Sequence, residues 1–224
     1  MKRKGMNYDV GRVMMGENWR PVFNPAIVHR ELEIIKNDLH CNAVRICGLN
    51  IDRLMTASED ALKQGLEVWL SPEMWDKSQE ETLDYLVKAA AAAEKLRQRW
   101  PQLVFSLGSE LTLFMQGIVE GNNLMERMEY LSSWENIRAG IHNKPLNAFL
   151  AEANEVIRQV FHGVFVFTFV SPTLTYSADP RYDLDMPSYS LVKSYADEHG
   201  TAYPDMPWEP KEAFKAVADY FAKQ

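Results

Sequence analysis

The sequence predicts an α/β protein built from consecutive strand–helix units, with about five parallel strands and flanking helices. Two observations carry this prediction. Short apolar runs alternate with longer segments whose apolar residues recur at helical spacing. Residues that cap helices or break them, chiefly Asn, Ser, Gly and Pro, stand at the boundaries between the two kinds of segment. This alternation is typical of parallel βα units.

Five runs are expected to form strands, and each is rich in β-branched or aromatic residues. In chain order they are residues 6–11, 42–47, 66–70, 103–107 and 164–170. Polar loops are expected at residues 12–24 and 171–210. A variable region from Leu111 to Asn143 is expected to be partly helical, around residues 124–139.

The helices between these strands have clear start signals. Asn24 with Pro25 predicts the first helix, Asn50 caps the second, and Ser78 with Glu81 forms a capping box for the third. Gly65 is expected to end the second helix in a left-handed conformation. The expected helices cover residues 25–40, 51–64, 79–100, 145–161 and 211–222.

Composition excludes several classes of function. The net charge of −7 argues against a nucleic-acid partner, because binding to phosphates requires clustered Lys and Arg. Charged residues interrupt every apolar stretch before it reaches transmembrane length, so no membrane partner and a cytoplasmic location are expected. Cys41 and Cys47 belong to no metal-ligand pattern and are expected to be reduced thiols. The sequence indicates neither a metal nor a cofactor, and it lacks a phosphate loop and a dinucleotide-binding fingerprint.

Three strand-end motifs resemble those of a known family. Asn42-Ala43-Val44-Arg45, Glu67-Val68-Trp69-Leu70-Ser71-Pro72 and Phe105-Ser106-Leu107-Gly108-Ser109-Glu110 look like strands two, three and four of clan-A glycoside hydrolases. Those enzymes are (β/α)8 TIM barrels, with an acid/base glutamate after strand four and a nucleophile glutamate after strand seven. Within the clan, the chain is similar to bacterial barrel proteins labelled abortive-infection proteins, a label that implies phage defence as one alternative function.

The resemblance covers only part of the family's barrel. Residues 1–161 look like units one to four, and residues 163–224 look like the last strand, a long loop and the last helix. Units five to seven have no counterpart, and no strand-ending glutamate follows Glu110. Ser109 stands where the family has an asparagine before its acid/base. The chain is therefore expected to be one incomplete, TIM-barrel-like domain that lacks the nucleophile.

Glycoside hydrolysis requires two carboxylates that flank the scissile bond. The resemblance makes Glu110 the acid/base, at the end of the fourth strand. The alternative for Glu110 is a loop carboxylate that caps the next helix or pairs with Arg45. Glu73, after the third strand, is the best remaining second carboxylate, although a loop glutamate is more often a solvated charge.

Other strand-end residues are candidates for binding a sugar. Asp9 is suited to orient a hydroxyl, and Arg45 is suited either to hold a carboxylate or to form a structural ion pair. Aromatic side chains stack on sugar rings, although those near strands are more often part of the core. The aromatic candidates are Trp69, Trp75, Tyr8, Phe114, Trp134 and Tyr176.

Three functions remain open at this stage. The chain is a glycosidase-like hydrolase with impaired activity, a non-catalytic carbohydrate-binding or phage-defence protein, or a structural barrel fragment that assembles. Five strands cannot close a barrel that has the geometry of eight. We therefore expect exposed sheet edges and a homo-oligomer formed through them.

Overall fold

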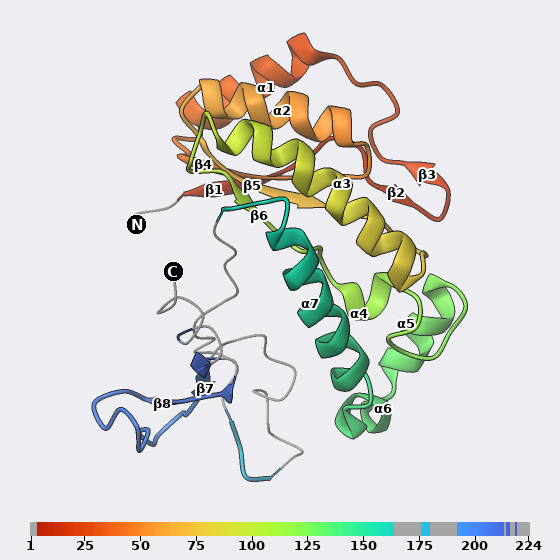
Figure 1. The fold of residues 1–224 in the computed structure, drawn as a ribbon, viewed down its shortest axis with the longest axis vertical. Coiled ribbons are helices and arrows are strands. Elements are labelled where there is room, and N and C mark those ends of the chain that lie inside the picture. Colours follow the sequence, from red (N-terminus) through yellow and green to blue (C-terminus); the bar gives the residue numbers. More distant parts are fainter. Residues whose placement is uncertain (1–3, 164–175, 180–191, 213, 216–217, 219–224) are drawn as a thin grey trace. The chain divides into compact units, whose positions relative to one another are not determined.

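A computed structural model describes residues 4–163, 176–179, 192–212, 214–215 and 218 (Figure 1). The chain falls into two compact units, Met1–Phe165 and Val166–Gln224. None of the described helices is long and apolar enough to cross a membrane. The prediction that both units belong to one incomplete barrel stays a prediction.

The first unit is built on a parallel four-stranded sheet with the order β1-β4-β5-β6. Its strands are β1 Gly5–Asp9, β4 Ala43–Gly48, β5 Glu67–Pro72 and β6 Val104–Phe105. The first four predicted strands are thus confirmed, with shifted ends, and the fifth, at residues 164–170, lies outside the described residues. The α/β class is therefore correct, and the strands follow one another across the sheet in chain order without the reversal of a doubly wound sheet.

Three helices connect these strands and begin where the capping signals predict: α1 Pro25–Asn37, α2 Ile51–Lys63 and α3 Gln79–Arg97. A further helix, α7 Asn143–Arg158, begins two residues before its predicted start at residue 145 and has no side-chain cap. The side chains of Asn24, Asn50 and Ser78 accept hydrogen bonds from the first helical turns, and Ser78 with Glu81 forms the predicted capping box. Gly65 has the expected left-handed φ of 83°.

Helices α1, α2 and α3 cover the same face of the sheet, because right-handed crossovers between successive strands carry each connecting helix to one side. Figure 1 shows α1, α2 and α3 as one layer over the strands. The register row Tyr8, Ile46, Leu70 and Phe105 is buried beneath this layer. The alternate row points to the opposite face and is exposed or half-buried: Asn7, Arg45, Trp69 and Val104.

Two expected loops contain short strands. Residues 12–24 form a hairpin of β2 Val13–Met14 and β3 Glu17–Asn18, with a left-handed Met15-Gly16 turn. In the second unit, β7 Val192–Ser194 pairs with β8 Trp208–Pro210 inside the expected loop 171–210. Pairs this short depend on a turn and carry almost no periodic signal, so the sequence did not reveal them.

The region 111–143 contains α4 Leu111–Phe114, α5 Leu124–Ser132 and α6 Trp134–Ala139, which agrees with the expected partial helicity. Of the expected closing helix, the described residues Glu212, Phe214, Lys215 and Ala218 are helical. The loops after β1, β5 and β6 all leave the carboxyl end of the sheet. Ligand sites of parallel sheets form at this end.

Candidate functional site

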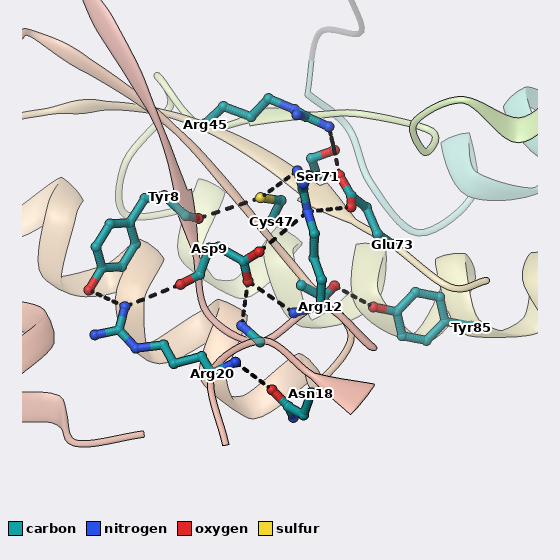
Figure 2. Close-up of polar contacts among 12 residues, drawn as sticks. Tyr8, Asp9, Arg12, Asn18, Arg20, Arg45, Cys47, Ser71, Glu73 and Tyr85 are labelled. Carbon is teal, nitrogen blue, oxygen red and sulfur yellow. Dashed lines mark hydrogen bonds and ion pairs between the residues drawn. The ribbon is translucent and has the colours of Figure 1, made fainter. Parts of the chain in front are cut away.

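A network of charged side chains lies at the carboxyl ends of β1, β4 and β5 (Figure 2). Its centre is Glu73, the first residue after β5, whose side chain is only 2% exposed. Arg45 Nη2 donates to Glu73 Oε1 at 2.7 Å and to Ser71 Oγ at 2.9 Å. Arg12 Nε lies 2.8 Å from Glu73 Oε2. Both oxygens of the carboxylate are therefore held by guanidinium groups.

Asp9 fixes the loop that delivers Arg12. Its Oδ1 accepts hydrogen bonds from the backbone N–H groups of Gly11 and Arg12, at 2.7 and 2.9 Å. Gly11 has a φ of 125°, and a Cβ at this position would lie 3.0 Å from both Arg53 Nη1 and Asn18 Oδ1. Only glycine allows this turn without strain, because L side chains rarely adopt that φ. The turn directs Arg12 back across the strand ends toward Glu73 (Figure 2).

Burial sets the protonation behaviour of this network. Burial raises the pKa of the Glu73 carboxyl, and the neighbouring Arg12 and Arg45 oppose that rise. Burial likewise raises the pKa of the Cys47 thiol to about 11, with the charge of Glu73 adding to the effect. Arg12 Nη2 donates to the sulfur at 3.1 Å. Cys47 is thus a protonated, buried thiol, as expected from the sequence, and not a nucleophile.

A second feature of the same end of the sheet is an aromatic cluster, formed by Trp19, Trp75 and Phe114. Trp75 and Phe114 stack with ring centroids 4.1 Å apart and planes 9° from parallel, and Trp19 meets Trp75 edge-on at 6.3 Å. The three residues come from the loops after β1 and β5 and from α4, which follows β6. Trp19 remains 53% exposed. The cluster therefore presents an aromatic surface to solvent.

Arg127 of α5 holds the segments that carry Trp75 and Phe114. Its side chain is 0% exposed, donates from Nε to Leu113 O at 2.6 Å and pairs with the carboxylate of Asp76. The backbone N–H of Asp76 donates to Phe114 O at 2.8 Å. Asp76 has a left-handed φ of 57°, which is uncommon for a residue with a side chain. Arg127 is thus a positioning residue for the aromatic cluster.

No protein-family model matches this chain, and no curated protein matches it. The chemistry of the site must therefore be argued from its own residues.

The two predicted catalytic carboxylates differ in their surroundings. Glu110 is exposed, follows β6 and has a left-handed φ of 49°. It occupies the N-cap position of α4 without making a side-chain capping bond, and none of the described residues pairs with its carboxylate. Arg45 pairs instead with Glu73, so neither alternative proposed for Glu110 is realised. The sequence left a solvated loop charge as the alternative role of Glu73. That alternative is wrong, because Glu73 is buried between two arginines.

The predicted binding residues fall into separate groups. Asp9 and Arg45 join the charged network, so the structural ion pair considered for Arg45 is present. Trp69 lies beside Arg45 across the β4–β5 ladder, and its Nε1 donates to Glu67 Oε1 at 2.6 Å. Trp75 belongs to the aromatic cluster. Tyr176 lies in the second unit, where its ring is 4.1 Å from Lys193 Nζ.

Sequence reasoning missed Arg12, Ser71 and Trp19. Arg12 and Trp19 stand in a segment expected to be an ordinary loop. The Met15-Gly16 pair, flanked by Val13 and Asn18, is the one signal that could have indicated a hairpin there. Nothing in the sequence links Arg12 or Ser71 to the Glu73 network. Among the residues the structure describes, no three His, Cys, Asp or Glu side chains converge to form a metal site.

Proposed function

We propose that this protein is a glycosidase-like (β/α)-barrel protein that binds carbohydrate at the carboxyl ends of its strands, with little or no hydrolysis of its own. The observation that carries the proposal is the aromatic cluster of Trp19, Trp75 and Phe114, together with Glu110 at the start of α4, whose carboxylate pairs with none of the described residues. Sugar rings combine apolar C–H faces with hydroxyl rims. A binding site for them needs an aromatic platform with polar groups at its edge.

The barrel assignment is supported by the order of the strands and the position of the helices. Strands that follow one another in chain order, with the three connecting helices on one face, have the layout of consecutive units in a TIM barrel. In such a barrel the face without helices is the interior. The half-buried row that includes Arg45 and Trp69 suits this position.

Two buried polar atoms in or near the aromatic cluster lack protein partners among the described residues, the Trp75 indole N–H and the Thr112 hydroxyl. The exposed carboxylate of Glu110 also pairs with none of these residues. Phe114 N–H donates to Glu110 O at 3.0 Å, so Glu110 and Phe114 share the turn of α4. Buried polar atoms without protein partners are usually satisfied by water or by a ligand. The left-handed backbone at Glu110 is the kind of local strain that occurs at functional sites.

The state of Glu73 argues for binding without turnover. A glycosidase needs a second carboxylate with an oxygen free to attack the sugar or to activate water. Glu73 is buried, and both of its oxygens are held by Arg12 and Arg45. Glu110 by itself supplies an acid and no nucleophile.

A titration with oligosaccharides, followed by tryptophan fluorescence or calorimetry, tests the binding. Trp19→Ala is expected to weaken binding at least about tenfold, because base or sugar stacking on an aromatic ring contributes on the order of 1–3 kcal/mol. Trp134→Ala is the matched control, since Trp134 is 42% exposed on α6 and lies outside the cluster. Binding that is equally strong in both variants would contradict the assignment of the site.

Hydrolysis of aryl glycosides distinguishes an active glycosidase from a protein that only binds carbohydrate. The unsubstituted protein is expected to release no more aglycone than its Glu110→Gln variant. Turnover that disappears in Glu110→Gln, in a protein with an unchanged circular dichroism spectrum, would instead establish an enzyme with Glu110 as its acid/base.

A further inference from the structure

We propose that Arg53 is a positioning residue of the carbohydrate site, because it clamps the two ends of the β2–β3 hairpin and so holds Trp19 in the aromatic cluster. This role rests on the proposed function, since a sugar is the ligand that Trp19 would stack on. The contacts that indicate the clamp are those of Arg53 with the hairpin, and they involve no ligand.

The hairpin that carries Trp19 is too short to hold its own position. Its strands β2 and β3 contain two residues each, and Trp19 follows directly after β3. A two-stranded hairpin is at best marginally stable in water by itself. The side chain of Trp19 is 53% exposed and meets Trp75 edge-on. The position of the Trp19 ring therefore depends on contacts that reach the hairpin from outside.

Arg53 supplies such contacts from the first turn of α2. Its Nη1 donates to Val10 O at 3.3 Å, before the hairpin, and to Arg20 O at 2.7 Å, after it. Its Nη2 donates to Pro21 O at 3.2 Å. One guanidinium thus joins the two ends of the hairpin, and one of the carbonyl groups that it holds belongs to the residue next to Trp19.

The guanidinium also packs against both ends of the hairpin. A Cβ at Gly11 would lie 3.0 Å from Arg53 Nη1, so the glycine lets the arginine approach the backbone closely. After the hairpin, the guanidinium carbon lies 5.3 Å from the centre of the Phe23 ring, within the range of a cation–π contact. The donors of a planar guanidinium have fixed directions, so this packing also orients its three hydrogen bonds.

The Arg53 side chain has no comparable role within α2. It lies in the first turn, where the helix dipole disfavours a positive charge. None of the ion pairs among the described residues includes Arg53, and the hydrogen bonds of its side chain all go to backbone carbonyl groups of residues 10–21. The cap of α2 is Asn50, whose side chain accepts from the backbone N–H of Arg53. The side chain therefore supports the hairpin rather than the helix.

The clamp leaves the backbone around Trp19 little freedom. The N–H of Trp19 donates to Arg12 O at 2.9 Å. The side chain of Arg20, the next residue, reaches back to the hydroxyl of Tyr8 at 3.0 Å and to Asp9 O at 3.2 Å (Figure 2). With the carbonyl of Arg20 held by Arg53, only the side-chain torsions of Trp19 remain free. A platform fixed in this way costs less entropy when a ligand binds.

A double-mutant cycle on oligosaccharide affinity tests whether Arg53 acts through Trp19. Arg53→Met keeps the aliphatic packing and removes the donors, so it should weaken binding about fivefold or more. Added to Trp19→Ala, the same substitution should weaken binding by less than about twofold further, because the ring that it positions is already absent. A general loss of folding would instead weaken both backgrounds alike.

Arg99→Met is the matched control for this cycle. Arg99 also lies over an aromatic ring, that of Trp100 at 4.2 Å, and it also contacts α2, through Glu59 at 3.0 Å. Its contacts lie outside the hairpin, so its replacement should change the affinity by less than about twofold.

Fluorine NMR of the chain labelled with fluorotryptophan tests the position of Trp19 without a ligand. The Trp19 resonance is assigned by its loss in Trp19→Phe, and Trp134 on α6 is the internal reference. In Arg53→Met the Trp19 resonance should move toward its position in urea, while that of Trp134 stays. Arg53→Lys should move it in the same direction, because one ammonium group lacks the planar fork that reaches three carbonyl groups, and this variant serves if Arg53→Met fails to fold.

The two measurements distinguish a failure of the clamp from a failure of the proposed function. An unmoved Trp19 resonance in both Arg53 variants, or a loss of affinity that is equally large in the Trp19→Ala background, would overturn the role of Arg53 and leave carbohydrate binding in place. An unsubstituted protein that binds no oligosaccharide would overturn the proposed function, and with it the carbohydrate site, even if the Trp19 resonance moves.

Discussion

Replacing Arg127 by methionine tests whether the buried arginine holds the loops that form the aromatic cluster. Arg127 is fully buried, and methionine keeps much of its aliphatic packing while removing the guanidinium. The substitution leaves Leu113 O without its donor at 2.6 Å and Gly121 O without a longer one at 3.4 Å. It also removes the partner of Asp76, whose side chain is 37% exposed.

The loss in free energy of unfolding can be estimated for each hydrogen bond that the substitution removes. A hydrogen bond from a charged group to a buried carbonyl contributes about 1.5–3 kcal/mol, and the longer bond to Gly121 contributes about 0.5 kcal/mol. Because Asp76 remains in contact with water, its pair adds no more than about 1 kcal/mol. The expected loss is therefore about 3 kcal/mol, a large share of the roughly 5–15 kcal/mol by which domains are stable.

Urea unfolding followed by circular dichroism measures this loss. Arg30→Met is the matched control, because Arg30 is 67% exposed and pairs with Glu33 at the surface, so its replacement should change the free energy of unfolding by less than about 0.5 kcal/mol. A loss below about 1 kcal/mol in Arg127→Met would refute the view that Arg127 positions the loops. An intermediate loss is expected for Arg127→Lys, which keeps the charge and loses the planar donor geometry.

Two further predictions follow from the protonation of buried groups. The bidentate bond from Arg97 lowers the pKa of Glu94 to about 2. A carboxyl with a lowered folded-state pKa stabilises the fold above its ordinary pKa of 4.5, and this contribution is lost as the pH falls toward 2. Glu94→Gln should therefore destabilise the protein by about 1–2 kcal/mol at pH 6 and by clearly less at pH 3, measured by urea unfolding; a difference independent of pH would contradict the pairing. Because burial raises the pKa of Cys47 to about 11, iodoacetamide at pH 8 should modify the half-buried Cys41 first, as read by peptide mass spectrometry, and equal rates in the folded protein would show that Cys47 is accessible.

The helices α1, α2 and α3 of the first unit were predictable because their signals are local. Asn24 before Pro25, the Ser78–Glu81 box and Gly65 each act within one helical turn, so residues a few positions apart fix these helix ends. The predicted strand ends differ from the observed ones by one or two residues. Pro72 lies beyond the strand expected at residues 66–70, yet it pairs with Gly48 as the last residue of β5, since the last residue of a strand does not need its N–H for the ladder.

The candidate site was only partly predictable. Strand ends near Asp9, Arg45, Glu73 and Glu110 could be found from the sequence, because a parallel sheet brings these ends to one edge. The side chains that pair with these residues could not be found from the sequence. Arg12 reaches Glu73 across 61 positions of the chain, and no sequence pattern encodes that distance.

By itself the sequence determined the α/β class, the order of the four sheet strands and their connecting helices, and the start of each of these helices, since backbone propensity, capping and hydrophobic period act over a few residues. Only the tertiary structure decided that Glu73 is locked between two arginines while Glu110 stays free, and that Trp19 joins Trp75 and Phe114. The physical reason is that burial and ion pairing depend on which distant segments meet. Those contacts also decide which carboxylate can act on a ligand and which can only support the fold.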